Sequence, residues 1–361
     1  SKELKQVLDL CLSCKACATE CPSNVDIASM KVEFLYQYQE TNGYSFRSKM
    51  FAKSTNFNKI ASRVPKLYNA VSQNIITSSI IKKITGVHQK RTLPKVSESF
   101  TSFINFSNYL DDDKIWIENP TKTLYLYIDE FTNYLDTEIG KDAMILLESL
   151  NYLVIPIHHL ESGRTYISKG FLNESKKIAN QNISFFKDLI TDSSPLIGIE
   201  PSAILTFRDE YLRLANDKVS AQKLSKNCFT VEEFLASELR KNKIDISLFS
   251  NETKELKIHG HCHQKALSST HATFSILNLP KNYKVTIMNT GCCGMAGSFG
   301  YEKEHYKVSM QVGEDTLFPK VRNCSPETEI AAAGTSCRHQ IYDGTKRIAK
   351  HPITILKEAL S

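Results

Sequence analysis

A single loop decides the fold. It runs Asn289-Thr290-Gly291-Cys292-Cys293-Gly294-Met295-Ala296-Gly297-Ser298-Phe299-Gly300 and places two adjacent cysteines among glycines. An apolar run from Val285 to Met288 precedes it and predicts a buried strand. A helical pattern follows from Glu302, so the cysteine pair lies in a strand-to-helix loop. Glycine lets the backbone there adopt positive φ and approach whatever the sulfurs hold.

Two more cysteines follow predicted strands. Cys262 comes after the strand Leu256 to His259, and Cys337 comes after the strand Glu329 to Ala332. Because open α/β sheets place their sites at the carboxyl ends of strands, we expect these three loops to converge. The predicted site contains candidate catalytic and metal-binding cysteines, together with cofactor-binding loop residues: Cys262, Cys292, Cys293 and Cys337, with Gly291, Gly294, Gly297 and His263.

The cysteine pair has two interpretations. Small buried hydrophobic residues in a tight loop would explain it without any chemistry. The two matching loop cysteines favour instead a group of thiolates that holds an iron–sulfur cluster, zinc or a redox disulfide.

Length and composition are typical of a soluble protein. The chain has 361 residues, 41% of them hydrophobic and 23% charged, which predicts two or three domains. Its ten cysteines are too few for a disulfide scaffold, so we expect a reducing, cytoplasmic compartment. No apolar stretch approaches the ~18 residues of a membrane span, and no secretory signal opens the chain. The chain has no initiator Met and leads straight into a metal motif, so we expect a fragment of a longer protein.

The N-terminal region contains that motif. Cys11-Leu12-Ser13-Cys14-Lys15-Ala16-Cys17-Ala18-Thr19-Glu20-Cys21-Pro22 has the C-x-x-C-x-x-C-x-x-x-C-P spacing of bacterial ferredoxins. We therefore expect Cys11, Cys14, Cys17 and Cys21 to bind a 4Fe–4S cluster, with zinc as the alternative. In two-cluster ferredoxins the fourth cysteine serves the other cluster, so Cys21 belongs either to this site or to a set completed upstream. We expect Lys15, between the ligands, to be solvated.

A basic span follows the motif. From Thr41 to Ser97 there is no Asp or Glu and there are eleven Lys and Arg residues, whereas the whole chain has a net charge of +6. Ordinary helices with basic outer faces would account for this pattern. The functional interpretation is that residues 41–97 dock on an anionic membrane surface, at the inner face of the membrane, or on an acidic partner protein. Nucleic acid is not expected, because aromatic residues and arginines do not interleave as in strand-binding grooves.

The chain divides into three predicted domains. Residues 1–95 form an all-helical, ferredoxin-like 4Fe–4S domain, and residues 87–120 have the composition of a linker. From Thr121 onward strands and helices alternate, which predicts parallel sheets with helices on their faces, in two α/β units at 96–250 and 251–361.

The two α/β units form an internal repeat. Three pairs of segments correspond: Tyr127 to Asp129 with His259 to Cys262, Glu161 to Arg164 with Cys292 to Met295, and Glu200 to Ala203 with Gly334 to Cys337. The first unit has the loops but no thiol at any matched place, so we expect it to be degenerate.

These segments resemble the iron–sulfur oxidoreductases with cysteine-rich CCG domains. That family includes the iron–sulfur subunits of glycolate oxidase and anaerobic glycerol-3-phosphate dehydrogenase, and one of the subunits of heterodisulfide reductase. The resemblance covers nearly the whole chain and is strongest to the C-terminal half of FAD-linked oxidases of the D-lactate or D-2-hydroxyglutarate dehydrogenase kind. It is carried by CLSCKACATECPSNVD, ESGRTYISKG, IEPSAILTFRDEY, HGHCHQKAL, GCCGMAGSFGYEKEHY and AAGTSCRHQIYDGT.

The resemblance implies an electron-transfer module. An FAD domain upstream, or an FAD-containing partner subunit, would oxidise a 2-hydroxy acid, and clusters would carry the electrons to a quinone or a carrier protein. The chain departs from the family pattern where cysteines are common, at Glu161, Ser162 and Ala203. Gln340 stands where the heterodisulfide reductase pattern has its last cysteine, which argues against the double cluster of that enzyme.

Several other residues support weaker hypotheses. His261, His263 and His339 lie near the thiols in sequence and allow a zinc site with mixed Cys and His ligands, although His263 bonding a backbone carbonyl is the alternative. The spacing of Gly294, Gly297 and Gly300 is not the dinucleotide fingerprint. A structural role or a free thiol is the default for the rest: His158, His159, Cys228 and Cys324.

The sequence therefore predicts an oxidoreductase of α/β class that acts as an iron–sulfur electron-transfer module. The alternative is a non-redox binding or scaffold protein whose cysteines hold structural zinc, which metal analysis would distinguish.

Overall fold

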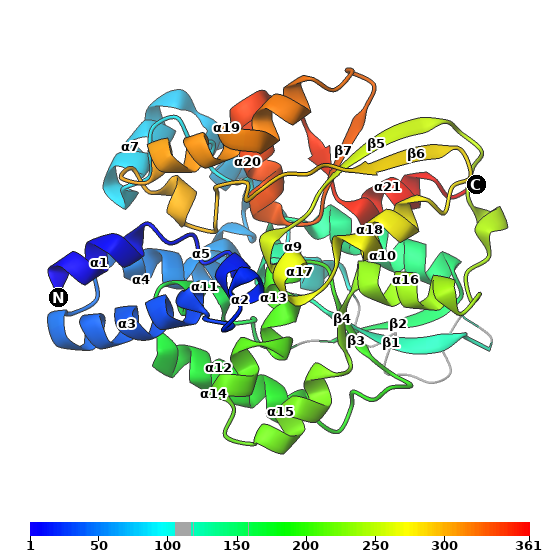
Figure 1. Cartoon of the computed structure of the whole chain (residues 1–361), viewed down its shortest axis with the longest axis horizontal. Helices are drawn as coiled ribbons and strands as arrows, with labels where there is room; N and C mark the ends of the chain where they lie inside the picture. The colour runs from blue at the N-terminus through cyan, green and yellow to red at the C-terminus, as the bar shows by residue number, and fades with distance from the viewer. Residues whose placement is uncertain (105–116, 118, 158) are drawn as a thin grey trace.

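In the described residues 1–104, the N-terminal third of the chain, the regular elements are helices, apart from an isolated β-bridge at Val87 (Figure 1). The computed structural model describes residues 1–104, 117, 119–157 and 159–361, so His158 and most of the C-terminal part of the predicted linker lie outside the described residues. The helices of this third are α1 (Lys2–Asp9), α2 (Ala16–Glu20), α3 (Ile27–Asn42), α4 (Phe46–Ala52), α5 (Ser54–Ala61), α6 (Pro65–Gln73), α7 (Ile75–Thr85) and α8 (Phe100–Phe103). Its ferredoxin-like character stays a prediction.

Local sequence explains where these helices begin and end. The Asp26 side chain accepts the backbone N–H of Ser29, 3.0 Å away, and caps α3. Pro65 occupies the first turn of α6, where no N–H is needed. Gly86 ends α7 in the left-handed conformation.

The first α/β unit is built on a four-stranded parallel sheet in the order β2-β1-β3-β4. Its strands are β1 (Lys122–Tyr127), β2 (Tyr152–Ile157), β3 (Leu196–Gly198) and β4 (Cys228–Thr230). Its helices are α9 (Glu130–Tyr134), α10 (Thr137–Ser149), α11 (Arg164–Ser168), α12 (Leu172–Phe186), α13 (Pro201–Ile204), α14 (Glu210–Leu214), α15 (Lys218–Ser225) and α16 (Val231–Arg240), with the 3₁₀ turns η3 (Leu205–Arg208) and η4 (Ile246–Leu248).

The second unit repeats this arrangement with the sheet order β6-β5-β7-β8. Its strands are β5 (Lys254–His259), β6 (Tyr283–Ile287), β7 (Glu329–Ala332) and β8 (Ala349–Lys350). Its helices are α17 (Cys262–Leu267), α18 (Thr270–Leu277), α19 (Tyr306–Arg322), α20 (Thr335–Thr345) and α21 (Pro352–Glu358), with the turn η5 (Phe299–Tyr301). The identical strand order confirms the predicted repeat and the α/β class.

The two units share one hydrophobic core. Helix α10 packs on α21, and α16 packs on α18, so each unit contributes one helix of each pair. Buried residues from both sheets, among them Leu124, Leu256 and Ala331, belong to the same apolar cluster. The Thr335 N–H donates to Glu200 Oε2 at 2.8 Å, which joins the β7–α20 turn to the matching β3–α13 turn. The carboxyl-end loops of the two sheets therefore meet.

Arg91 joins the N-terminal third to the second unit. It is 1% exposed, and its guanidinium donates to Gly300 O at 2.6 Å, Gln340 Oε1 at 2.6 Å and Ser309 Oγ at 2.7 Å. Part of the basic span thus stabilises the fold instead of facing a partner. Within the described residues, no helix is both long and apolar enough to cross a membrane.

Some predicted elements differ from the structure. The helix expected from Pro201 to Leu214 is divided into α13, η3 and α14, because Asp209 leaves helical geometry at φ −132° and ψ −84°. The helix expected from Glu302 begins at Tyr306. The strands β4 and β8 are absent from the sequence prediction, because three and two residues are too few to show a periodicity.

Candidate metal centre

The glycines of the Cys292–Cys293 loop differ in what they do. Gly294 has φ +89°, and a Cβ there would lie 2.2 Å from the backbone oxygen of Ser309, so only glycine fits. The Ser309 hydroxyl also donates to Gly294 O at 2.6 Å and fixes the turn. Gly297 has φ +61° in open space, whereas Gly291 has no positive φ and a Cβ there would meet only Thr316 Oγ1, at 3.8 Å. The loop therefore depends on Gly294 more than on the other two predicted glycines.

The structure brings the four thiols of the second unit together. Cys262 begins α17 directly after β5, and Cys337 lies in the first turn of α20 after β7. Hydrogen-bond contacts run from Cys262 to Cys292, from Cys292 to Cys293, and from Cys293 to Cys337. We call these four residues the second thiol site. The Cys292 thiol and burial raise the pKa of Cys262 well above its usual range, an effect that a bound cation would reverse.

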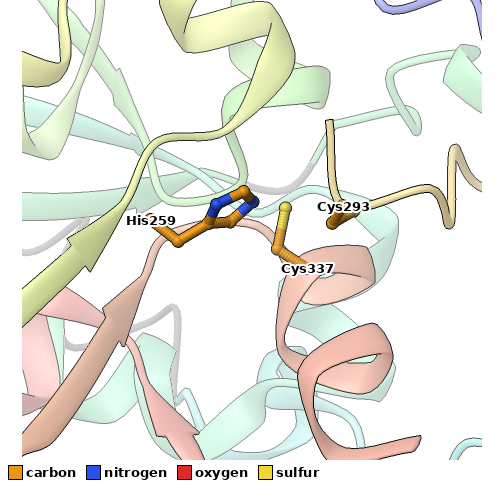
Figure 2. Close-up of side chains that lie close together, drawn as sticks. All are labelled: His259, Cys293 and Cys337. Carbon is orange, nitrogen blue, oxygen red and sulfur yellow. The ribbon is translucent and has the colours of Figure 1, made fainter. Parts of the chain in front are cut away.

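His259 completes this group, although the sequence did not single it out. One ring nitrogen of His259 and the sulfurs of Cys293 and Cys337 lie within 4.8 Å of one another, and all three residues are buried (Figure 2). The other nitrogen, Nδ1, lies 2.8 Å from Thr290 Oγ1. Burial lowers the pKa of His259 to about 3, so the imidazole is neutral. His259 is the last residue of a predicted strand, and this position could have indicated from the sequence that it lies at the site.

The histidines that the sequence did single out have other contacts. His263 Nε2 lies 3.2 Å from Ser13 O, which agrees with the backbone-carbonyl alternative for this residue. His339 Nδ1 lies 2.9 Å from the Tyr301 hydroxyl, and His261 Nε2 lies 3.8 Å from Glu200. Within the described part of the chain, none of the three belongs to the compact ligand group of His259.

The N-terminal cysteine motif (Cys11, Cys14, Cys17 and Cys21) lies between α1 and α3. Burial raises the pKa of Cys14, and the thiols of Cys262, Cys11 and Cys17 raise it further because they are close. Cys21 instead has the backbone N–H groups of Val25 and Ser23 beside its sulfur, which lower its pKa. The loop uses left-handed backbone at Ser13 and Lys15, so its shape is held by tertiary contacts.

Lys15 corrects one expectation. The sequence predicts a solvated side chain, but Lys15 is 3% exposed and pairs with Asp209, with Glu210 at 3.3 Å and with Asp26 at 3.4 Å. Burial lowers the pKa of the Lys15 ammonium, but the carboxylates of Glu210 and Asp209 outweigh this effect and raise the pKa above its usual value. Sequence alone cannot show this pairing, because two of the three partners lie almost 200 residues away. Lys31 donates to Cys11 O at 2.6 Å and adds a second cation near the motif.

The two cysteine sets are neighbours in space. Helix α17, which begins at Cys262, packs on α2 of the N-terminal motif. The His263–Ser13 contact and the effect of Cys262 on Cys14 come from this packing. Two groups of thiols far apart in the sequence thus form adjacent sites.

Known proteins match the chain along its whole length. It is 26% identical over 364 residues to D-2-hydroxyglutarate dehydrogenase of Escherichia coli K12, a match that covers all of this chain and 35% of that protein. It is 24% identical to a subunit of anaerobic glycerol-3-phosphate dehydrogenase of the same organism, over 94% of this chain and 83% of that protein. An uncharacterized iron-sulfur protein of Methanococcus maripaludis is 25% identical over 51% of this chain and 30% of its own length. No protein-family model matches the chain.

The resemblance to iron–sulfur oxidoreductases is confirmed. The matches support the predicted role of an iron–sulfur electron-transfer module, linked to a dehydrogenase. The chain spans about a third of the length of the D-2-hydroxyglutarate dehydrogenases that it matches.

The first unit of this iron–sulfur module has carboxylates where the second has thiols. Glu130 begins α9 after β1, as Cys262 begins α17 after β5. The Glu130 carboxylate accepts hydrogen bonds from the backbone N–H of Ser162 at 2.8 Å and from the Ser162 hydroxyl at 2.7 Å. Burial, followed by the charge of Glu130, raises the pKa of the nearby Glu161 to about 7. The loops keep their geometry, while their side chains form a hydrogen-bonded acidic cluster without sulfur ligands.

The Gln340 side chain packs beside Gly294 and bonds Ser309 and Arg91. Its amide nitrogen donates to Ser309 O at 3.0 Å, and its oxygen accepts from Arg91. The side chain at the place of the last family cysteine therefore supports the loop backbone and supplies no further thiol.

Proposed function

We propose that the chain is the iron–sulfur electron-transfer module of an FAD-linked 2-hydroxy-acid dehydrogenase or oxidase. Cys11, Cys14, Cys17 and Cys21 would hold a 4Fe–4S cluster, and Cys262, Cys292, Cys293 and Cys337 would hold a second iron–sulfur cluster or zinc. Such clusters supply one-electron transfer when bound. The electron donor is the flavin of an FAD-containing domain or subunit, and the acceptor is a quinone or a carrier protein.

The observation that carries this proposal is the adjacency of the two cysteine sets. Helix α17 contributes Cys262 to the second thiol site and, through His263, contacts the loop of the N-terminal motif at Ser13. Two unrelated structural zinc sites would have no need to share a helix. Adjacent redox sites do, because electron transfer requires them to be close.

The donor sets fit sulfur-rich metal centres. The four thiols follow one another as neighbours, and the buried Nε2 of His259, which has no hydrogen-bond partner in the described chain, lies in the group with Cys293 and Cys337. Together they form a soft ligand set that favours zinc or iron–sulfur clusters. Near the N-terminal motif, the Lys31 ammonium donates to Cys11 O, whereas the charge of Lys15 is taken up by its carboxylate partners.

Each of the three predicted regions has its own role in this proposal. We assign residues 1–95 to the first cluster, residues 96–250 to a supporting unit without thiols, and residues 251–361 to the second thiol site. Because the chain spans about a third of its dehydrogenase relatives, we place the FAD on a further domain or on a partner subunit.

One surface is proposed to contact anionic lipid at the inner face of the membrane. Exposed isoleucines of α7 and apolar residues of α6 lie among lysines, in a span without Asp or Glu. Helices that combine these features bind at membrane interfaces. We call this surface the α6–α7 surface; its residues are Lys66, Leu67, Val71, Ile75, Ile76, Ile80, Lys83 and Ile84.

Anaerobic reconstitution with iron and sulfide tests the central proposal. We expect iron and labile sulfide in stoichiometric amounts and a broad absorption near about 400 nm that bleaches with dithionite. Cys14→Ser should lose part of the iron, whereas Cys324→Ser is the matched control, because the Cys324 thiol bonds Lys320 O among the described residues and lies outside both cysteine sets. Equal iron content and equal spectra in the two variants would contradict the proposal.

The second candidate function is a scaffold protein with structural zinc. It is favoured by one observation, the compact group of His259, Cys293 and Cys337, which also suits tetrahedral zinc. Zinc without sulfide in protein purified anaerobically would support it.

A further inference from the structure

We propose that His259 is a ligand of the metal at the second thiol site, through Nε2 and beside the sulfurs of Cys293 and Cys337. The inference deepens the proposed function in that it requires a metal at this site, but it holds for zinc as well as for a cluster. Its basis is the one group of three ligand side chains within 4.8 Å of one another that the described residues contain (Figure 2).

The backbone holds His259 firmly at the base of the site. It is the last residue of β5 and pairs with Ala332, the last residue of β7. Each strand then leads within a few residues to a thiol, Cys262 after β5 and Cys337 after β7. The ring thus lies where the ends of two neighbouring parallel strands meet, on rigid elements and not on a loop.

Hydrogen bonding selects the tautomer that a metal ligand needs. Thr290 Oγ1 lies 2.8 Å from His259 Nδ1 and 3.5 Å from Met288 O, so a hydroxyl proton directed at Met288 O leaves Oγ1 to accept the Nδ1–H of His259. With the proton on Nδ1, Nε2 has an available lone pair. Histidine ligands in proteins commonly have such a partner on the second nitrogen, which fixes the ring and its tautomer. Thr290 lies two residues before Cys292, so one loop positions the histidine and supplies the thiols.

The free nitrogen is costly unless something binds it. His259 is 1% exposed, and Nε2 has no hydrogen-bond partner within the described ranges. A buried acceptor without a partner destabilises the folded state, because it has lost its hydrogen bonds to water. His261 Nδ1 is unpaired as well, but His261 does not belong to the compact ligand group, so what distinguishes His259 is the combination of a free nitrogen with two sulfurs close by.

Mixed ligation has a consequence for the chemistry. Neutral imidazole adds a ligand without the negative charge of a further thiolate, and histidine ligands raise the reduction potential of clusters relative to all-cysteine ligation. The second thiol site would then be a better electron acceptor than the N-terminal motif, which has cysteine ligands only.

Pulsed EPR on protein labelled with ¹⁵N-histidine tests the ligand directly. The labelled protein is reconstituted with iron and sulfide and reduced, and a second sample is loaded with Co²⁺ alone. We expect a coupling from directly bonded nitrogen that is lost in His259→Ala, together with a fall in Co²⁺ affinity larger than the roughly 10–100-fold that the loss of an outer-shell partner costs. His263→Ala is the matched control, a buried histidine four residues away that should keep the coupling.

Two further variants separate ligation from misfolding. Imidazole added to His259→Gly should restore the nitrogen coupling and the Co²⁺ spectrum. Thr290→Val, which removes the acceptor for Nδ1–H, should weaken Co²⁺ binding without abolishing it. A spectrum that is the same in wild type, His259→Ala and His263→Ala overturns the ligand assignment for whichever metal is bound.

The test also distinguishes this inference from the proposed function. A His259-dependent Co²⁺ spectrum at a site that takes up no iron and sulfide supports the ligand and contradicts the second cluster. An iron–sulfur signal without nitrogen coupling supports the cluster and overturns the ligand. A site that binds neither metal overturns both.

Discussion

His263 donates through Nε2 to the backbone oxygen of Ser13, 3.2 Å away, and so joins the second α/β unit to the N-terminal cysteine loop. Ser13 has φ +51°, a left-handed conformation that is unfavourable for serine unless contacts hold it. The same helix begins at Cys262. One hydrogen bond therefore connects the backbone of the first site to the element that carries a thiol of the second.

His263→Ala should slow electron transfer between the two sites without removing either metal. The lost hydrogen bond costs about 0.5–1.5 kcal/mol and loosens the packing of α17 on α2. Stopped-flow reduction, with separate spectral signals for the two sites, measures the rate. His271→Ala, an exposed histidine on α18, should leave it unchanged. Iron loss from the N-terminal motif in His263→Ala would instead indicate a role in assembly.

Gly294→Ala and Gly291→Ala should differ sharply. A Cβ on Gly294 would lie 2.2 Å from Ser309 O at φ +89°, whereas one on Gly291 meets only Thr316 Oγ1 at 3.8 Å. We expect Gly294→Ala to lose metal at the second thiol site and more than about 2 kcal/mol of stability, and Gly291→Ala to be nearly neutral. Metal analysis with thermal unfolding measures both. Equal behaviour of the two variants would show that the turn is not needed.

The comparison of these two glycines shows where sequence reasoning ends. Both flank the cysteine pair and the sequence treats them alike, yet a steric constraint from Ser309, on a helix that begins after the loop, exists only at Gly294. The convergence of the cysteines was predictable, because parallel strands place their carboxyl ends at one edge. The repeat was also predictable, because corresponding loop residues are spaced similarly along the sequence in the two α/β units, and this implies corresponding strands.

Long-range pairing accounts for what the sequence could not provide. Lys15 is buried because α14 brings Asp209 and Glu210 to the motif, and no local pattern shows this. His259 ends a predicted strand, but its ring is aimed by Thr290, 31 residues later. The sequence favours His261 and His263 as candidates because they flank Cys262. Being next to Cys262 in the sequence does not determine where their imidazole rings point.

Lys15→Met should destabilise the protein and loosen the N-terminal motif. The variant leaves Asp209 and Glu210 buried with less compensation, at a cost on the order of 3 kcal/mol at pH 7. Denaturant unfolding measures the change, with Lys176→Met, an exposed lysine of α12, as the control. A change as small as that of the control would mean that the ion pairs contribute nothing.

The same network predicts an acid dependence. Against the effect of burial, Arg164 and Lys15 hold the pKa of Glu210 well below its usual range. The resulting stability is present above the unfolded pKa of about 4.3 and is lost as the pH falls below it, because the unfolded state then binds a proton that the folded state does not. Lys15→Met should lose less stability than wild type on going from pH 7 to pH 3.

Glu161→Gln should gain stability relative to wild type as the pH rises. Burial, then the charge of Glu130, raises the pKa of Glu161 to about 7. Between about pH 4.3 and 7 the folded state keeps a proton that the unfolded state has released, so wild type becomes less stable with rising pH. The amide removes this loss, on the order of 4 kcal/mol by pH 8. Unfolding at pH 5 and pH 8 measures it. Glu174 is an exposed residue of α12, so the stability of Glu174→Gln relative to wild type should be the same at both pH values.

The α6–α7 surface should bind anionic vesicles in a salt-dependent manner. Exposed lysines attract an acidic lipid surface by about 1 kcal/mol each, and this attraction is screened by salt. Replacing Lys66 and Lys83 by Glu should therefore weaken binding by tenfold or more, and replacing Ile75 and Ile76 by Ser should remove the apolar contribution. Co-sedimentation with vesicles of phosphatidylserine and phosphatidylcholine, at low and high ionic strength, measures both effects.

The control is the double variant Lys176→Glu with Lys177→Glu on α12. It changes the net charge by the same amount at exposed positions elsewhere, so it separates a local surface from a general charge effect. Equal binding of the two charge variants would show that net charge, and not this surface, attracts the protein to lipid. No binding at low salt would leave an acidic protein as the occupant of the basic span.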